Sequence, residues 1–116
     1  MPNQIEIVTL VPTITVAANG NSLEYPLDIS KYSKTTLYVI TSAVAGTLPT
    51  IDITIRDLEE IGGYGFTNTA LAQISNTGFA RYAITPTTRK LYATWTLGGS
   101  AGNTVTIKIV IYGTIS

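Results

Sequence analysis

The chain contains no cysteine and no histidine among its 116 residues. Without cysteine it has no disulfide, no thiolate metal ligand and no cysteine nucleophile. Without histidine it lacks the side chain that most often serves as a general base or as a transition-metal ligand. A domain of this length buries roughly two-thirds of its unfolded surface, so it needs no disulfide to fold. These absences exclude the commonest catalytic and metal-binding arrangements.

Charge is also scarce. Asp, Glu, Lys and Arg make up 12% of the residues, and the net charge is zero, whereas an average domain is about 25% charged. Such a surface offers no electrostatic footprint for nucleic acid or anionic lipid. We therefore expect no nucleic-acid partner and no membrane. Because few charges keep copies apart, we also expect surfaces that other molecules cover.

Long apolar runs are missing as well. Hydrophobic residues reach 45%, yet no run approaches the roughly 20 residues that a membrane-spanning helix requires. The opening stretch MPNQIEIVTL has neither the basic region nor the uninterrupted apolar segment of a signal peptide. We therefore expect a protein that is made in the cytoplasm.

What the chain does have is alternation with a period of two residues. Isoleucine alternates with polar residues over 51–55, and residues 105–111 carry the longest apolar stripe. Turn signals such as NGNS and GGSAGN recur about every 8 to 12 residues, the spacing of a sandwich or barrel. We predict an all-β protein, a single antiparallel β-sandwich of about eight strands over residues 1–116, immunoglobulin-like or jelly-roll-like. Residues 1–18 are expected to form an extended arm or an edge strand that contacts a neighbour.

Strands are predicted where this alternation is regular. The segment 57–66, which ends in GGYGF, is predicted to be a loop, because glycine tolerates positive φ. In the strand at 89–97 we expect Leu91, Ala93, Trp95 and Leu97 to point inward and Tyr92, Thr94 and Thr96 outward. The other predicted strands include 35–44, the stretch that starts at 49, 69–75, 78–85 and 104–113.

The outward positions carry threonine where a soluble sheet usually carries lysine and glutamate. Threonine favours strands through its branched β-carbon. It leaves sheet edges without the lysines that discourage edge-to-edge pairing. We expect homo-association or docking onto a partner surface; a neutral surface on a stable monomer is the alternative.

Three stretches, in order, resemble a known family: LDISKYSKTTLYVITSAVAGTLPTIDITIRDLEE, a glycine-aromatic loop, and RKLYATWTLGGSAGNTVTIKIVIYG. Their spacing is similar to that of small β-sandwich structural proteins of tailed-bacteriophage virions, such as capsid-decoration and accessory head or neck proteins. The family loop is often longer and carries a Trp, where this chain has Tyr64 and Phe66. The resemblance implies a non-enzymatic virion protein that stabilises the shell. Its implied partners are the major capsid protein, other virion proteins or its own copies in a homo-oligomer, and it implies no cofactor.

An acidic cluster, Asp57, Glu59 and Glu60, raises the question of a metal or a reaction. Calcium takes six to eight oxygens, but the spacing differs from the D-x-[DN]-x-[DN]-G pattern, and a solvated strand end is the alternative. A glycosidase needs two carboxylates across a cleft, and the chain has no long loops to wall one. We therefore expect no enzyme activity.

Aromatic and apolar side chains outside the core are the candidates for binding. Tyrosine is enriched at protein interfaces, can stack on sugar rings in a carbohydrate- or host-surface-binding module, and can also cap the rim of a core. These readings stay open. The predicted interface residues are Ile5, Ile7, Tyr64, Phe66, Tyr92 and Tyr112.

Overall fold

The computed structural model describes residues 4–22, 26–59, 64–84 and 90–115, without the side chains of residues 59 and 64–66. Within these ranges the chain forms β-strands and no helix. The strands are β1 (Gln4–Val16), β2 (Gly20–Asn21), β3 (Leu27–Asp28), β4 (Lys34–Ala45), β5 (Thr50–Glu59), β6 (Tyr64–Ala70), β7 (Gly78–Ile84), β8 (Lys90–Gly98) and β9 (Thr104–Ile115).

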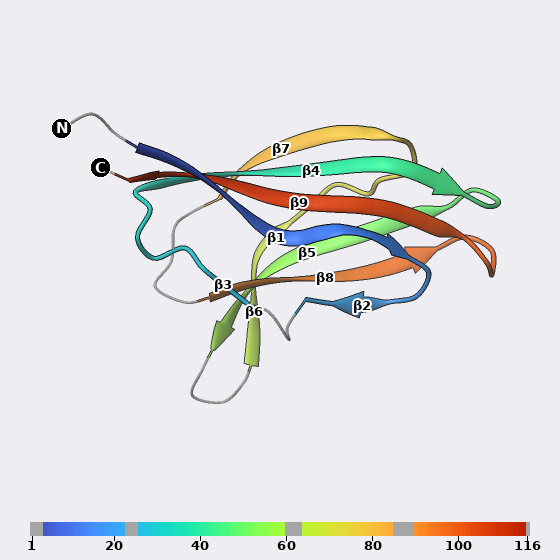
Figure 1. Cartoon of the computed structure of the whole chain (residues 1–116). Coiled ribbons are helices and arrows are strands. Elements are labelled where there is room, and N and C mark those ends of the chain that lie inside the picture. Colours follow the sequence, from blue (N-terminus) through green and yellow to red (C-terminus); the bar gives the residue numbers. More distant parts are fainter. Residues whose placement is uncertain (1–3, 23–25, 60–63, 85–89, 116) are drawn as a thin grey trace.

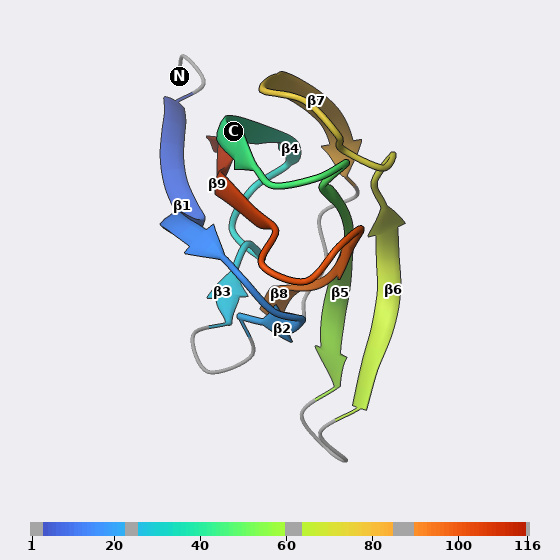
Figure 2. The ribbon, with the colours of Figure 1, turned by 90° about the vertical axis from the view of Figure 1, so that its right-hand side faces the viewer.

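The strands pair into two antiparallel sheets that pack face to face (Figure 1). The first sheet has the order β1-β9-β4-β7, and the second has the order β2-β8-β5-β6, with β3 also paired to β8. Figure 2, turned by 90°, shows the two layers and the strands that lie at their edges. The predicted all-β sandwich is confirmed.

The connections identify the kind of sandwich. β2 and β3 pair with successive parts of β8, at Trp95 and Leu91 respectively, so they act as one interrupted strand. Counted this way, the first strand pairs with the last, the second with the second-last, β4 with β7 and β5 with β6. A long antiparallel hairpin wound into two four-stranded sheets is a jelly roll. Of the two sandwich types considered from the sequence, the structure has the jelly-roll one.

The core lies between the sheets and follows from the alternation. Side chains at every second position of a strand point to the same face, so β5 and β9 each present a row of isoleucines to the interior. Full burial of such a side chain stabilises the fold by about 1.5–3 kcal/mol. Trp95 and Leu97 pack against this core as predicted. The isoleucines of the two rows, each exposed by 1% or less, are Ile51, Ile53, Ile55, Ile107, Ile109 and Ile111.

The segment 57–66 was predicted to be a loop, and this is wrong. β5 continues to Glu59 and β6 begins at Tyr64, with Glu59 paired to Tyr64. Backbone pairing between the two strands therefore overrides the glycines, and the segment is a hairpin whose turn lies outside the described residues. Figures 1 and 2 show this hairpin projecting beyond the body of the sandwich.

The strand predicted at 69–75 is displaced for the same reason. The strand is β6 and it ends at Ala70, after which the chain crosses to the other sheet. Ile74 forms an isolated bridge to Ile51, with N–H···O distances of 2.9 and 3.0 Å in the two directions. This bridge holds the crossing segment against the edge of the second sheet.

β1 is an edge strand that pairs with β9 along its whole length. The register shifts between Thr9 and Val11 and again between Val11 and Ile14. Each shift inserts an extra residue into β1, as in a β-bulge, and an extra residue moves the following side chains to the other face. Ile5 and Ile7 consequently point outward, whereas Val11 is buried. The expected edge strand is present; its contact with a neighbour stays a prediction.

At one end of the sandwich a buried asparagine joins two turns. Asn103 Oδ1 accepts a hydrogen bond from the Thr47 N–H at 2.9 Å. Its Nδ2 donates to the carbonyl oxygens of Thr47 at 3.0 Å and Gly98 at 3.3 Å. A Cβ at Gly46 or Gly99 would collide with the Asn103 side chain, and both glycines have positive φ. Asn103 thus fixes the β4–β5 and β8–β9 turns relative to each other.

Candidate interaction surface

The outer face of the first sheet carries a group of apolar side chains. Strand pairing sets them in rows across the sheet. Tyr112 of β9 lies opposite Ile7 of β1, and Ile40 of β4 lies opposite Phe79 of β7. Their chain neighbours point into the core, so these side chains face away from it. We call this group the apolar face: Ile5, Ile7, Tyr38, Ile40, Phe79, Val110 and Tyr112.

The side chains of the apolar face also pack against one another. The Tyr38 and Tyr112 rings lie 4.8 Å apart between centroids and are tilted by 54°. Val110, which pairs with Tyr38, is only 8% exposed although it lies outside the core cluster. Neighbouring side chains on the outer face must therefore cover it. The face is an ordered apolar layer on the outside of the sheet.

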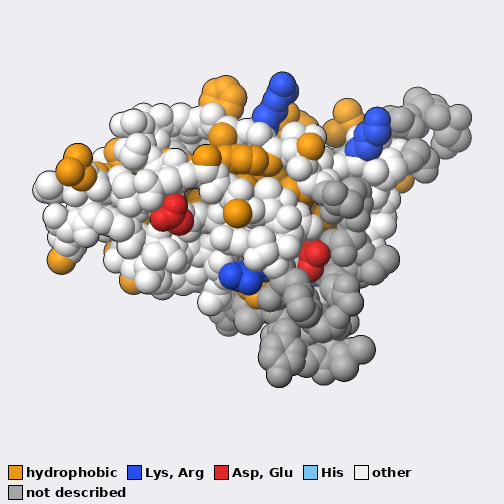
Figure 3. Space-filling model, turned by 180° about the vertical axis from the view of Figure 1, so that it is seen from behind, with side chains coloured by type: hydrophobic (Ala, Val, Ile, Leu, Met, Phe, Trp, Pro, Cys, Tyr) orange, Lys and Arg blue, Asp and Glu red, His pale blue; other side chains and the backbone are white. Residues whose placement is uncertain are grey.

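Much of this layer is open to solvent. Phe79 is 80% exposed, Ile5 68% and Ile7 59%. Four strands about 4.8 Å apart and some six residues of each, at about 3.4 Å per residue, span roughly 400 Å². The apolar side chains fill only part of this span, which is similar in size to the largest apolar patches of ordinary monomers; such patches are often functional. Figure 3 shows the molecule from behind, on the side away from β1 and β9; acidic and basic side chains are few and scattered there, and hydrophobic ones lie along the upper margin.

The structure brings together three of the predicted interface residues. Ile5, Ile7 and Tyr112 all belong to the apolar face. The side chains of Tyr64 and Phe66 lie outside the described part of the chain, so their predicted role stays a prediction. Tyr38 and Ile40 also belong to the apolar face but are not among the predicted interface residues.

Tyr92 was predicted to be an interface residue, and its burial contradicts this prediction. It lies outside the core cluster and between Leu91 and Ala93, which are both fully buried in the core. The predicted outward orientation therefore agrees with the alternation. The side chain is nevertheless only 7% exposed, because neighbouring structure covers the outer face of the second sheet at this point. Tyr92 offers a partner almost no surface.

Phe79 and Val110 were missed because an apolar side chain in a strand ordinarily indicates the core. A signal was nonetheless present in β4, where Leu37, Tyr38, Val39 and Ile40 are consecutive. A strand that is apolar at both parities is covered on both faces. That reading would have indicated an apolar outer face on whichever sheet contains this strand.

The acidic cluster gives no metal centre in the part that the structure describes. No group of three or more acidic side chains able to hold a metal ion is found among the described residues. Asp57 instead accepts a hydrogen bond from Asn68 Nδ2 at 3.2 Å. Glu60 lies outside the described residues and so does the Glu59 side chain, so the calcium hypothesis for the full trio is not tested.

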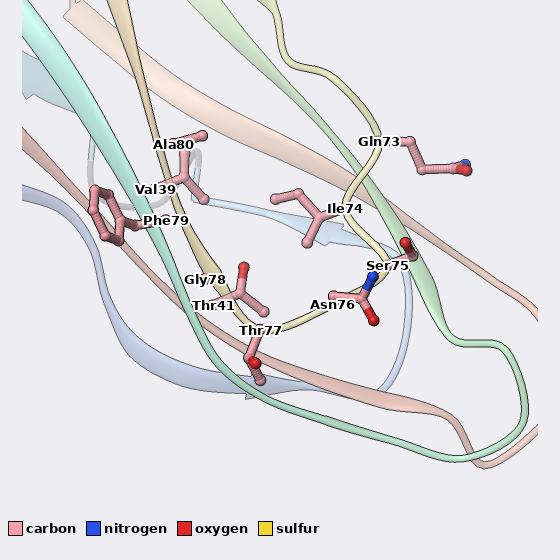
Figure 4. A pocket seen from close by; sticks show the side chains of 10 residues that line it. All are labelled: Val39, Thr41, Gln73, Ile74, Ser75, Asn76, Thr77, Gly78, Phe79 and Ala80. Carbon is pink, nitrogen blue, oxygen red and sulfur yellow. The ribbon is translucent and has the colours of Figure 1, made fainter.

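A shallow pocket of about 270 Å³ opens at the β7 edge of the sandwich, between β4, β7 and the crossing segment 73–77. Figure 4 shows Gln73 and Phe79 pointing away from each other at opposite sides of it. None of its ten lining residues is charged. The pocket therefore contains no carboxylate or ammonium group for acid–base chemistry.

A polar cluster ties the start of β1 to the rest of the sandwich. The Tyr32 hydroxyl donates a hydrogen bond to Glu6 Oε1 at 2.8 Å, and Lys31 Nζ lies 2.8 Å from the same oxygen. The hydrogen bonds from Lys31 and Tyr32 lower the pKa of Glu6. Burial, followed by the hydrogen bond to Glu6, raises the pKa of Tyr32. The cluster fixes β1 as part of the sheet.

Comparison with known proteins gives a fold but no family. No family model matches the chain, and no curated protein sequence matches it. The crystal structure of YomS, a protein derived from the SPBc2 prophage, is similar with a TM-score of 0.56 at 10% identity, over 97% of this chain and 96% of YomS. The VP2 subviral particle of infectious bursal disease virus gives 0.54 at 13% identity, over 97% of this chain but only 33% of VP2.

A third similar structure is the CBM36-1 domain of a multidomain xylanase from the hindgut metagenome of Trinervitermes trinervoides. It gives a TM-score of 0.50 at 12% identity, over 95% of this chain and 97% of that domain. At such identities the likeness establishes the shared fold alone. The described residues also contain no helix long and apolar enough to cross a membrane.

Proposed function

We propose that this chain is a non-enzymatic structural protein of a phage-like virion, a capsid-decoration or accessory protein that binds the shell through its apolar face. The observation that carries the proposal is the ordered apolar layer on the outer face of the first sheet. A side chain such as Phe79, 80% exposed, gains by leaving water at about 25 cal/mol per Å² of apolar surface. Adhesion needs no other chemistry.

Two further observations support a structural role. The jelly roll is an architecture of viral capsid and lectin domains, and similar folds occur in a prophage-derived protein and in a viral particle protein. In this proposal the two-sheet body is a rigid support, and the outer face of its first sheet is the surface that binds the shell.

The test is to look for the chain in particles. Virions purified from the source culture are analysed by quantitative mass spectrometry, and intact particles are labelled with an antibody against the chain. The proposal expects the chain at a fixed ratio to the major coat protein, with label on the particle surface. Purified particles that lack the chain would rule the proposal out.

A carbohydrate-binding role is the second candidate, favoured by the contact between half-buried Tyr38 and exposed Tyr112 on a fold shared with a carbohydrate-binding domain. Against it, the Tyr38 and Tyr112 rings are tilted by 54° and so do not form one flat platform. A glycan array tests this candidate: it requires a signal that Tyr112→Ala removes. Silence on the array, with the chain present on virions, favours the structural role.

A further inference from the structure

Within the described ranges of the chain, the charged side chains that point outward from the first sheet all have the same sign. Lys108 pairs with Ile40, Arg81 pairs with Tyr38, and Lys34 pairs with Thr114 at the end of the face. Among the described residues, no aspartate or glutamate points outward from the first sheet. Glu6 of β1 pairs with Gly113 and reaches Tyr32 on the inner side. The described charged side chains on this side of the sheet are therefore all cations.

Among the described residues, these cations have no acidic partner. The ion pair in the described part joins Lys31 to Glu6, and none of Lys34, Arg81 and Lys108 takes part in it. The described aspartates Asp28, Asp52 and Asp57 belong to strands of the second sheet. Although the net charge of the protein is zero, the described residues thus place positive charge without an acidic partner on the outer face of the first sheet.

We propose that the partner of the apolar face is an acidic protein surface, in which carboxylates surround an apolar centre, and that the partner is not the same face of a second copy. This inference rests on the proposed function and names the partner's chemistry. Charge complementarity steers association and suppresses wrong partners. Three cations among apolar side chains match a surface whose carboxylates occupy the corresponding positions.

Face-to-face pairing of two copies is disfavoured by the same charges. A twofold interface brings the same patch of both copies together, so cations would face cations with no carboxylate between them. The size of the face argues in the same direction. A stable interface buries about 800 Å² per partner, about twice the span of the face estimated above, so the charged side chains within and beside the face must lie in the contact.

Nucleic acid is the weaker alternative. Its binding is carried by contacts to phosphates and needs no exposed isoleucine or phenylalanine. Ile5 and Ile7 are each more than half exposed and would stay in water on a phosphate backbone. A protein partner can cover the apolar side chains and also pair with the cations.

The experiment uses source particles that have been stripped of the chain, to which purified full-length chain is added back. A matched pair of variants separates the two faces: Arg81→Glu on the apolar face and Arg56→Glu on the second sheet. We expect Arg81→Glu to bind about tenfold more weakly and Arg56→Glu to bind within about twofold of wild type, as expected for loss of charge complementarity at one face only. Circular dichroism confirms that both variants fold. Wild-type binding should also weaken as salt is raised.

The outcomes distinguish this inference from the proposed function. Equal binding of wild type and Arg81→Glu overturns the acidic partner and leaves the virion role intact. Light scattering that shows a wild-type dimer which Tyr112→Ser abolishes also overturns it, because the face would then pair with itself. Failure of wild type to bind the stripped particles overturns both. Binding of the wild type to a synthetic oligonucleotide that Arg81→Glu abolishes would replace the protein partner with nucleic acid.

Discussion

The two sheets present different side chains on their outer faces. On the first sheet the register brings Ile40 next to Phe79 and Tyr112 next to Ile7. On the second sheet it brings Thr94 next to Thr54 and Thr96 next to Asp52. The inner faces of both sheets are equally apolar, because each contributes a row of fully buried isoleucines to one core.

The polar side chains of the second sheet also have partners within the chain. Gln73 Nε2 donates to both carboxylate oxygens of Asp52, at 3.3 and 3.1 Å. Thr94 Oγ1 approaches the Thr54 carbonyl oxygen at 3.5 Å. The outer face of this sheet is polar, whereas that of the first sheet is largely apolar. The same alternation builds the inner face of both sheets, and the outward residues alone distinguish the polar outer face from the proposed docking face.

The largest expected effect is the loss of stability when a core isoleucine is truncated, and it should be about equal in the two sheets. Ile53→Ala in the second sheet and Ile109→Ala in the first each remove a side chain that is 1% exposed or less. Each should lower the free energy of unfolding by about 3 kcal/mol, from lost burial and the cavity left behind. Urea denaturation measures both. A loss of less than about 1 kcal/mol for either variant would mean that its side chain is not part of the shared core.

The next effect comes from the contact between the Tyr32 ring and Gly113 of β9. Tyr32 lies over Gly113 of β9, where an added Cβ would collide with its ring. Gly113→Ala should therefore destabilise the fold by about 2 kcal/mol, in the range for overpacking. The control is a double-mutant cycle with Tyr32→Ala, in which removal of the ring should relieve most of the cost of the added methyl group. Full additivity of the two changes would contradict the contact.

A surface change should separate stability from binding. Phe79→Thr on the apolar face and Thr96→Val on the second sheet are both exposed sites, and both replacements are β-branched residues that suit strands. Each should change the free energy of unfolding by less than about 0.5 kcal/mol. Retention on a hydrophobic-interaction column should fall for Phe79→Thr and not for Thr96→Val. A strongly destabilised Phe79→Thr would mean that this side chain serves the fold.

The smallest effect depends on pH. Hydrogen bonds from Lys31 and Tyr32 hold the pKa of Glu6 below its usual 4.5, so the folded state binds fewer protons than the unfolded state. Its contribution to stability is present above pH 4.5 and is lost as the pH falls through the lowered pKa. The pKa values of Tyr32 and Lys31 are raised above 10.0 and 10.5, so their contribution is present below pH 10.0 and is lost at higher pH.

Denaturant midpoints of wild type and Glu6→Gln test this window. The wild type should be the more stable near neutral pH, and the difference should shrink below pH 4.5. A difference that stays constant down to pH 2 would mean that the Glu6 charge contributes nothing.

The fold was predictable wherever alternation was uninterrupted. The predicted strands at 35–44 and 89–97 differ from β4 and β8 by no more than about a residue at each end, within the usual uncertainty of strand boundaries. β6 was misplaced because Gly62, Gly63 and Gly65 read as a loop, while pairing with β5 is a long-range interaction that local sequence does not reveal. The bulges of β1 left little local signal beyond Pro12.

The candidate site was predictable only in part. Tyr112 could be found because it alternates with the deeply buried Ile111 stripe of β9. Phe79 could not, because the face on which it lies depends on the pairing of β7 with β4. The covering of Tyr92 depends on neighbouring segments in space. Strand parity gives orientation, whereas exposure depends on tertiary structure.

The account depends on which outer face meets a partner. Cryo-electron microscopy of the source virion, with this chain traced in the density, tests that most directly. The account predicts that Tyr112, Ile40 and Phe79 lie against apolar side chains of a neighbouring subunit and that Arg81 and Lys108 face its carboxylates, with Thr96 and Asp52 in solvent. Density that places the second sheet against the shell and leaves Tyr112 in solvent would contradict it.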